Sequence, residues 1–343
     1  MTVLSVAYPF APVRAGSAGG AEQVLHMLDA AIVRAGNRSI VIAQEGSEVE
    51  GELIAMPSPT GVIDEKARRR AHSAFKAAIG KALKGQAIDI VHMHGLDFRS
   101  YLPEPGVPVL VTLHLPLEWY GKDAFSLLRP GTYFNCVSGS QRRAMHGFES
   151  IPLIENGVPV ERLRLKAAKR SFAISIGRVC PEKGFHIAAD AAREADIPLI
   201  IAGEVYPYPE HERYFREVLA PKLGKGCRFI GPVGFERKRR LLSAARCLIV
   251  PSLVPETSSL VAMEALACGT PVVANSIGAL EEIIEHGRTG FLVKNTDDMA
   301  KAINDAKGIS PEVCMAEARK RFSSAVMAAK YIEAYKKICM RKP

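Results

Sequence analysis

The sequence predicts an α/β protein with two Rossmann-like parallel-sheet domains, because strand-like and helix-like segments alternate over most of its 343 residues. The short β-rich segments form two consecutive series, and a stretch rich in glycine and proline separates them. Folds of this class bind ligands in loops at the carboxyl ends of their strands. We therefore expect two domains that face an interdomain cleft, with the functional side chains in loops that follow strands.

The first domain is expected to span residues 1–160. Its two long predicted helices are residues 21–35 and 64–84, and the second is amphipathic. It ends near Asn156-Gly157-Val158-Pro159, where glycine and proline interrupt the alternation. The predicted strands of this domain are residues 3–7, 39–43, 89–92, 109–113 and 133–137.

A second domain is expected at residues 161–320, because the same alternation begins again after residue 169. The chain then becomes helical, and we expect the segment 321–343 to pack back on the first domain. The predicted strands of the second domain are residues 172–176, 199–202, 227–230, 247–250, 271–274 and 291–293.

The composition is that of a globular protein, with 48% hydrophobic and 24% charged residues. No apolar run approaches the roughly 18 residues of a transmembrane helix, and residues 1–6 have the pattern of a strand rather than of a signal peptide. The seven cysteines lack paired spacing, which predicts free, mostly buried thiols in a reducing compartment. We therefore predict a cytoplasmic protein.

The net charge of +9 lies mostly after residue 165. A site for a diphosphate ligand would need such positive potential, whereas no recognition motif accompanies the charge, so nucleic-acid binding is not expected. The basic helix at 64–84 has an apolar face made mostly of alanine. It is expected to pack on the sheet with a solvated basic face; the alternative is peripheral contact with the inner face of the membrane.

Two carboxylates, Glu256 and Glu264, bracket a predicted helix that ends at Gly269. Glu264 lies among small and apolar residues, where an unpaired charge is costly to bury. Nothing nearby in the sequence supplies a cation, so we expect ligand hydroxyls to partner it. A continuous helix would place the two residues about 12 Å apart, more than the roughly 5–10 Å of an acid/base pair on one bond. This separation suits an extended ligand held at two places.

Thr257, Ser258 and Ser259 lie between these carboxylates, at the start of the predicted helix. Backbone N–H groups at a helix N-terminus attract phosphate. A nucleotide sugar has the matching layout of sugar hydroxyls, a diphosphate and ribose hydroxyls.

Arg178 and Lys183 lie directly after a predicted strand and before a helix, which is where open α/β sheets bind ligands. Two cations at this position could stabilise a departing diphosphate in place of a metal. The alternative is a solvated loop in which Glu182 pairs with one of them.

Three weaker signals lie in the first domain. Gly19 and Gly20 follow the first strand and open a helix, so they form either a ligand loop or a flexible turn. His114 ends a predicted strand and could contact a sugar or orient a reacting group, or be structural. His92 and His94 share one face of a strand, but no third residue completes a metal site.

Taken together, these segments resemble the retaining GT-B glycosyltransferases of family 4 (glycosyl transferases group 1). The resemblance covers most of the chain in the family's order. Its supporting segments are Gly19-Gly20-Ala21-Glu22, Asp89-Ile90-Val91-His92-Met93-His94-Gly95 and Ile154-Glu155-Asn156-Gly157-Val158. Its specific segments are Gly177-Arg178…Glu182-Lys183-Gly184 and Glu256…Glu264-Ala265…Cys268-Gly269-Thr270-Pro271-Val272.

The resemblance implies that Arg178 and Lys183 hold the donor diphosphate, while Glu264 binds the ribose. It also implies that Glu256 binds the transferred sugar and that His114 lies near the reacting sugar. Gly19 and Gly20 would lie beside the diphosphate and the acceptor.

The resemblance further implies a UDP-type sugar donor, retention at the anomeric carbon, no cofactor and no required metal. The acceptor would be a sugar, a lipid-linked glycan or a small molecule, in glycan, glycolipid or glycosylated-metabolite biosynthesis. Thr257-Ser258-Ser259 departs from the Gly-Phe-Gly usual in the family. The alternative is a non-catalytic nucleotide-sugar-binding protein on the same fold.

Overall fold

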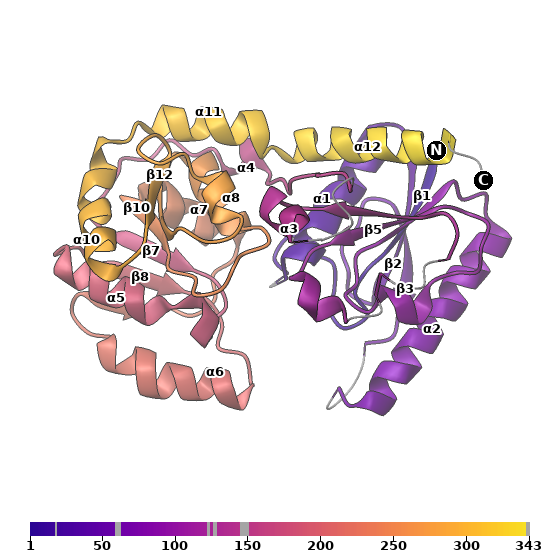
Figure 1. Cartoon of the computed structure of the whole chain (residues 1–343), viewed down its shortest axis with the longest axis horizontal. Helices are drawn as coiled ribbons and strands as arrows, with labels where there is room; N and C mark the ends of the chain where they lie inside the picture. The colour runs from indigo at the N-terminus through magenta and orange to yellow at the C-terminus, as the bar shows by residue number, and fades with distance from the viewer. Residues whose placement is uncertain (18, 59–62, 122–123, 126–128, 145–150, 341–343) are drawn as a thin grey trace. The chain divides into compact units, whose positions relative to one another are not determined.

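The computed structural model describes residues 1–17, 19–58, 63–121, 124–125, 129–144 and 151–340. It divides into two compact units, of which the first comprises Met1–Asn156 with Ser324–Pro343 and the second Gly157–Ser323. Each unit contains one sheet of six strands, and every strand pairing in both sheets is parallel. Helices surround each sheet (Figure 1). The predicted α/β fold with two parallel-sheet domains is thereby confirmed.

The sheet of the first unit has the strand order β3-β2-β1-β4-β5-β6. Five of its strands fall within the predicted series, but β3 was missed because Glu-Leu-Ile-Ala-Met is short, partly exposed and lacks β-branched alternation. The strands are β1 (Thr2–Val6), β2 (Arg38–Gln44), β3 (Glu52–Met56), β4 (Ile90–Met93), β5 (Val109–Leu113) and β6 (Thr132–Cys136).

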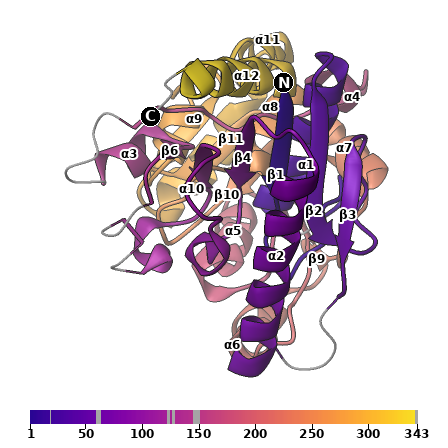
Figure 2. The same cartoon turned by 90° about the vertical axis from the view of Figure 1, so that its right-hand side faces the viewer.

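Two long helices and the C-terminal helix cover this sheet. The Asp64 side chain caps α2 by accepting a hydrogen bond from Ala67 N at 2.7 Å, and Figure 2 shows α2 beside β2 and β3. The last helix belongs to this unit and packs against α1. The helices of the unit are α1 (Gly20–Arg34), α2 (Glu65–Gly85), α3 (Gly139–Arg143), α12 (Ser324–Met340) and the short turns η1 (Phe98–Tyr101) and η2 (Leu117–Tyr120).

The first sheet is apolar on one face and partly polar on the other. Val91 and Met93 of β4 join a large buried cluster with Phe75 and Ile79 of α2. Because side chains alternate along a strand, His92 points to the opposite face. There it meets buried polar residues of β5 and β6 and two tyrosines of α12.

The sheet of the second unit has the order β12-β11-β10-β7-β8-β9. Numbered along its own chain segment, this is the same doubly wound order as in the first unit. The strands are β7 (Ala173–Ile176), β8 (Leu199–Ala202), β9 (Cys227–Phe229), β10 (Cys247–Val250), β11 (Val272–Asn275) and β12 (Gly290–Val293).

Helices cover both faces of this second sheet. The helices are α4 (Val160–Leu163), α5 (Phe185–Glu194), α6 (Pro209–Arg213), α7 (Phe235–Ala244), α8 (Leu260–Ala267), α9 (Leu280–Ile283), α10 (Thr296–Asp305) and α11 (Pro311–Arg321). Some of them are connected by the 3₁₀ turns η3 (Pro181–Lys183), η5 (Ala220–Lys222) and η6 (Ala306–Gly308) and by the π-helix η4 (Tyr214–Leu219).

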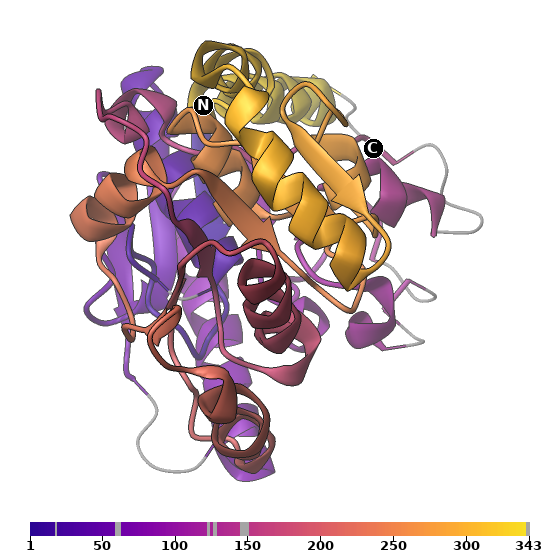
Figure 3. The same ribbon diagram turned by 90° about the vertical axis from the view of Figure 1, so that its left-hand side faces the viewer.

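Alternating residues of β10 pack in two separate hydrophobic cores of this unit, one on each face of the sheet. Leu248 and Val250 of β10 pack in the cluster that includes α7, α8 and α11, whereas Cys247 and Ile249 pack in the cluster of α5 and α10. Figure 3 shows α10 in orange on its face of the sheet. Because both faces of the second sheet are buried, its strands are continuously apolar.

The strand orders define one topological switch point in each unit, since the chain leaves β1 toward one edge of its sheet and reaches β4 on the other side. The corresponding neighbours in the second unit are β7 and β10. The loops after these strands are where doubly wound folds bind ligands. In the second unit they are residues 177–184 and 251–259.

Within the described parts of the chain, none of the helices combines the length and the hydropathy needed to cross a membrane.

Candidate functional site

The two switch-point loops of the second unit bring together Lys183 and Glu256, which are 73 residues apart in the sequence. Lys183 Nζ lies 2.5 Å from Glu256 Oε1, and their side chains are 29% and 11% exposed. The buried Ser252 hydroxyl donates a hydrogen bond to the same carboxylate oxygen. The pair is therefore a charge-assisted contact at the carboxyl end of the sheet, partly open to solvent. Ser252 was missed in the sequence because a lone serine carries no signal.

Gly184 allows the two loops to touch. Its backbone is left-handed, with φ +63°, and a Cβ there would lie 2.3 Å from the carbonyl oxygen of Pro251. Next to it, Leu253 N donates a 2.8 Å hydrogen bond to the carbonyl of Glu182. The Gly184 position thus fixes the loop that carries Lys183 against the loop that carries Glu256.

Gly278 positions Glu256 from the other side. Its φ is +60°, and a Cβ there would lie 2.6 Å from the carbonyl oxygen of Glu256. The same carbonyl accepts a 2.8 Å hydrogen bond from Ala279 N. The backbone of Glu256 is therefore held by the segment after β11, with no room for a side chain at residue 278.

Arg178 lies in the same loop as Lys183, with its side chain exposed. Its guanidinium carbon is 6.0 Å from the centroid of the Tyr206 ring, a cation–π arrangement. Of the two cations that Glu182 could pair with, Lys183 pairs with Glu256 instead. Burial raises the pKa of Glu182, but a hydrogen bond from Cys180, backbone hydrogen bonding and the charge of Arg178 together bring it below its usual value.

The helix α8 begins at Leu260, so Thr257, Ser258 and Ser259 form the loop before it rather than its first turn. Ser259 is the N-cap residue, and its side chain makes no capping bond. The assumption of a continuous helix from Glu256 to Glu264 is therefore wrong, and the separation of about 12 Å no longer follows from helix geometry. The first N–H groups of α8 lack partners within the helix, as at any helix N-terminus.

Glu264 has a cation, contrary to the expectation from its sequence neighbours. Lys238 Nζ of α7 lies 2.5 Å from Glu264 Oε1, and the two side chains are only 15% and 5% exposed. Lys238 precedes Glu264 by 26 residues and lies in the basic run Arg237-Lys238-Arg239-Arg240. The ion pair compensates the negative charge of Glu264 at Oε1. Burial of this carboxylate therefore does not by itself require a ligand.

In the first unit, His114 follows β5 and His94 follows β4. His94 Nδ1 lies 3.0 Å from His114 Nε2, and the rings stack with centroids 5.3 Å apart. Burial lowers the pKa of His114 to about 3 and that of His94 well below its usual value, where the neighbouring histidines add to the effect. Both imidazoles are therefore uncharged near neutral pH.

His92 is structural. Its Nδ1 and Nε2 lie 2.7 Å from Tyr335 Oη and Thr112 Oγ1, so both ring nitrogens are occupied by protein partners. Thr112 Oγ1 donates in turn to Asn135 Oδ1 at 2.7 Å.

Gly19 and Gly20 lie at the start of α1, as the N-cap and first helical residue. A Cβ on Gly19 would lie 1.9 Å from Oε2 of the buried Glu22, so the carboxylate occupies the space that glycine leaves. Burial raises the pKa of Glu22. Ala18 lies outside the described residues, and a role of Gly19 and Gly20 in ligand binding stays a prediction.

The helix α2 buries Ala67, Phe75, Ile79 and Ala82. Its basic residues from Arg68 to Arg70 are exposed, and the Arg68 guanidinium carbon lies 5.7 Å from the centroid of the Phe10 ring. Contact of this face with a membrane stays a prediction.

Two family models match the chain. The model of Glycosyltransferase Family 4 matches residues 18–162, and that of Glycosyl transferases group 1 matches residues 161–325.

Individual relatives match over different lengths. A glycosyltransferase of Methanocaldococcus jannaschii, MJ1178, is 27% identical over 67% of this chain and 68% of its own length. The alpha-maltose-1-phosphate synthase of Mycobacterium tuberculosis is 31% identical over 50% of this chain and 49% of its own length. The D-inositol 3-phosphate glycosyltransferase of Streptomyces scabiei is 46% identical over 24% of this chain and 19% of its own length. The chain thus spans half or less of the latter two.

Solved structures share the fold over the whole chain. Sucrose-phosphate synthase from Thermosynechococcus elongatus has a TM-score of 0.80 at 19% identity, covering 100% of both chains. AviGT4, a glycosyltransferase involved in avilamycin A biosynthesis, has a TM-score of 0.76 at 23% identity, covering 100% of this chain and 99% of its own. Anabaena HepE, solved in complex with UDP-glucose, has a TM-score of 0.76 at 18% identity, covering 98% of this chain and 100% of its own.

The two family models together account for residues 18–325, and the doubly wound sheets agree with the solved structures. The chain belongs to the family 4 glycosyltransferases and has their GT-B fold.

Proposed function

We propose that this glycosyltransferase transfers a sugar from a UDP-linked donor to an acceptor hydroxyl, with retention at the anomeric carbon and without a divalent metal. The observation that carries the proposal is the Lys183–Glu256 contact of 2.5 Å at the switch point of the second unit. A cation and a carboxylate at this position can grip the diphosphate and the sugar hydroxyls of one donor. The choice of UDP is supported by HepE, a solved structure of the same fold that was obtained with UDP-glucose.

Binding of a donor would rearrange this ion pair. A diphosphate carries more negative charge than one carboxylate, so Lys183 would turn from Glu256 toward the phosphate oxygens. Glu256 would then be free to accept hydrogen bonds from hydroxyls of the transferred sugar. Arg178 would supply a second cation for the diphosphate, and the N–H groups at the start of α8, next to Ser258 and Ser259, would supply further donors.

The ribose would be held by Glu264. Its Oε1 is bound by Lys238, which keeps the carboxylate oriented, while its other oxygen can accept hydrogen bonds from ribose hydroxyls. Lys238 thereby becomes a positioning residue of the nucleotide site.

In the chemical step, the acceptor hydroxyl would attack the anomeric carbon from the side of the leaving group. The bond from that carbon to the phosphate oxygen breaks as the new glycosidic bond forms. The proton of the acceptor passes to the leaving phosphate oxygen. Lys183 and Arg178 stabilise the negative charge that develops on the diphosphate. His114 would contact the transferred sugar as a neutral hydrogen-bonding group, because burial lowers its pKa to about 3.

The alternative, a non-catalytic nucleotide-sugar-binding protein, would bind the donor without breaking its glycosidic bond. Arg178, Lys183 and Glu256 are all present in this chain, which favours the enzyme. Slow release of UDP from UDP-glucose in the absence of acceptor would distinguish the two functions.

The proposal is tested by a thermal-shift panel of UDP-, GDP- and ADP-sugars in the presence of EDTA. We expect the UDP-sugars to raise the unfolding temperature most, and EDTA to leave that shift unchanged. A shift with GDP- or ADP-sugars alone would overturn the choice of UDP, and a shift that needs a divalent cation would overturn metal-independent binding.

A further inference from the structure

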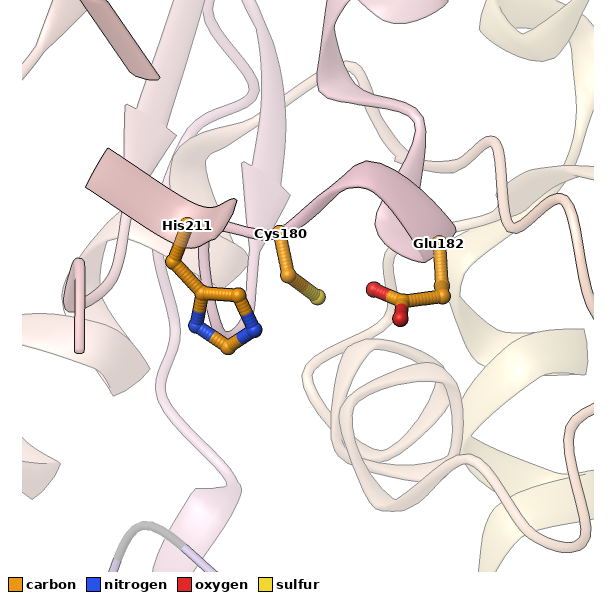
Figure 4. A group of neighbouring side chains, drawn as sticks. All are labelled: Cys180, Glu182 and His211. Atoms are coloured by element: carbon orange, nitrogen blue, oxygen red, sulfur yellow. The ribbon is translucent and has the colours of Figure 1, made fainter. Parts of the chain in front are cut away.

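Three side chains of metal-binding type converge at the loop after β7 in the second unit, residues 177–184, which we call the donor loop. Cys180 and Glu182 belong to the loop after β7, and His211 belongs to α6. One ligand atom from each lies within 4.8 Å of the other two. Figure 4 shows the Cys180 sulfur between the imidazole of His211 and the carboxylate of Glu182. Residues from separate segments thus meet at one point.

Two polar atoms of this group have no hydrogen-bond partner in the described part of the protein, although the Cys180 thiol donates to the Arg178 carbonyl. Glu182 Oε2 and His211 Nδ1 are buried and have no hydrogen-bond partner among the described residues. His211 is 8% exposed and Cys180 is fully buried. A buried carboxylate oxygen or ring nitrogen without a partner is costly, and a bound cation would remove that cost for the carboxylate.

The backbone holds the group in place without a ligand. Pro181 begins the turn η3 and restricts the chain between Cys180 and Glu182. Hydrogen bonds from Val179 N to the Glu204 carbonyl, 2.9 Å, and from Leu253 N to the Glu182 carbonyl, 2.8 Å, fix the loop on both sides of the group.

The imidazole of His211 is held by two aromatic neighbours. The Tyr206 ring stacks on it with centroids 6.3 Å apart, and the Tyr208 ring meets it edge-on at 5.1 Å. Because the His211 imidazole is already restrained, it loses little rotational freedom when it binds a metal.

We propose that Cys180, Glu182 and His211 form a binding site for Zn²⁺. A thiolate, an imidazole and a carboxylate are the ligand types that Zn²⁺ combines, whereas Mg²⁺ and Ca²⁺ prefer oxygen ligands alone. Three protein ligands leave a fourth tetrahedral position for water. On binding, the Cys180 thiol releases its proton to solvent and the sulfur forms the bond to the metal.

The site differs in role from the transfer reaction. Arg178 and Lys183 lie on either side of Cys180 and Glu182 in the sequence, and neither is a ligand in the group. Zn²⁺ would link the donor loop to α6. The charge of the diphosphate would still be neutralised by Arg178 and Lys183. An effect of Zn²⁺ on donor affinity rests on the proposed function, but the binding of the metal does not.

Cobalt spectroscopy of the full chain tests the site. The protein is treated with EDTA, desalted and titrated with Co²⁺, which gives a thiolate-to-metal charge-transfer band when it is bound by cysteine. We expect one equivalent of Co²⁺ to produce this band and Zn²⁺ to abolish it. Cys180→Ser should lose the band, and His211→Ala and Glu182→Gln should each weaken binding by about tenfold or more.

Cys339→Ser is the matched control, because Cys339 is the partly exposed thiol among the free cysteines and lies in α12. It should keep the band. Thermal unfolding in EDTA should give similar midpoints for the parent chain and the His211→Ala variant, which separates lost binding from lost folding. No band in the parent chain, or a band that persists in Cys180→Ser, would overturn the site and leave the thiol as a simple hydrogen-bond donor to the Arg178 carbonyl.

Discussion

Glu264 and Lys238 form a partly buried ion pair whose two functions can be separated by mutation. Removing one partner of such a pair leaves an uncompensated buried charge and costs about 3–5 kcal/mol of stability, whereas replacing both by apolar residues of similar volume is close to neutral. A single Glu264→Ala variant would therefore lose stability as well as any contact with ribose.

The double variant Lys238→Met/Glu264→Leu removes the contact without stranding a charge. We expect its unfolding temperature to stay within a few degrees of the parent, while its affinity for UDP falls about tenfold or more, because hydrogen bonds to a charged group contribute roughly 1.5–3 kcal/mol. Isothermal titration measures the affinity and calorimetric unfolding the stability. Unchanged UDP affinity in the folded double variant would remove Glu264 from the site.

Lys183 is expected to act mainly in the transition state. Negative charge grows on the diphosphate as the glycosidic bond breaks, so Lys183→Ala should lower kcat by about 10²–10³-fold and raise the donor KM much less. Steady-state kinetics in EDTA would measure the effects on kcat and on the donor KM separately. Lys222→Ala is the matched control, since Lys222 forms a comparable ion pair with Asp190 elsewhere in the same unit. A Lys183 variant with a raised KM and normal kcat would contradict the role.

The ion pair of Glu264 also shows where inference from sequence stops. A buried carboxylate in a small, apolar segment predicts that some partner exists, and the structure supplies one. The identity of that partner depends on how α7 packs against α8, which is a tertiary contact. The spacing between Glu256 and Glu264 suggested one continuous helix, whereas α8 starts only at Leu260. Where a helix begins also depends on the surrounding fold.

At the scale of elements, the loops that carry the site depend on glycines with left-handed backbones. Gly278→Ala would place a Cβ 2.6 Å from the Glu256 carbonyl oxygen and would also strain a φ of +60°. We expect the loop of Glu256 to shift and the activity to fall about tenfold or more. Gly287→Ala is the matched control: its φ is +77°, but nothing lies within 4 Å of the added carbon.

Both variants would be compared by thermal unfolding and by donor turnover. The control carries the backbone strain alone and should lose stability with little loss of turnover per folded molecule. Equal loss of turnover in the two variants would show that the close approach at Gly278 does not position Glu256.

Most strands could be predicted because parallel strands with two buried faces are continuously apolar and lie between turn residues. The exception, β3, lies at the edge of its sheet and exposes part of its length, so its sequence carries no such signal. The polar face under α12 was also beyond prediction. His92 and Tyr335 are 243 residues apart, and only the fold makes them partners.

At the scale of the molecule, the buried histidines of the first unit should make stability depend on pH. Burial lowers the pKa values of His92, His94 and His114 below the usual value of about 6.5. Below that pH the unfolded chain binds protons that the folded chain excludes, so the free energy of unfolding falls as the pH drops. Each imidazole contributes up to about 1.4 kcal/mol per pH unit in this range.

Urea unfolding between about pH 5 and pH 7.5 measures this dependence. The slope of stability against pH should decrease in His94→Gln, because this substitution removes an imidazole that binds a proton in the unfolded chain but not in the folded chain. The matched control is His286→Gln, because His286 is exposed. A slope that is the same in all three proteins would contradict the neutral, buried state of His94.

In the proposed function, the Lys183–Glu256 pair marks the place where the donor diphosphate and sugar bind. Its most direct test is isothermal titration of UDP-glucose, in EDTA, into the parent chain and the double variant Lys183→Met/Glu256→Gln. We predict metal-free binding to the parent and an affinity about 100-fold lower for the double variant, with the fold retained because no charge is left without its partner. Equal affinity of the two proteins for UDP-glucose would contradict the claim.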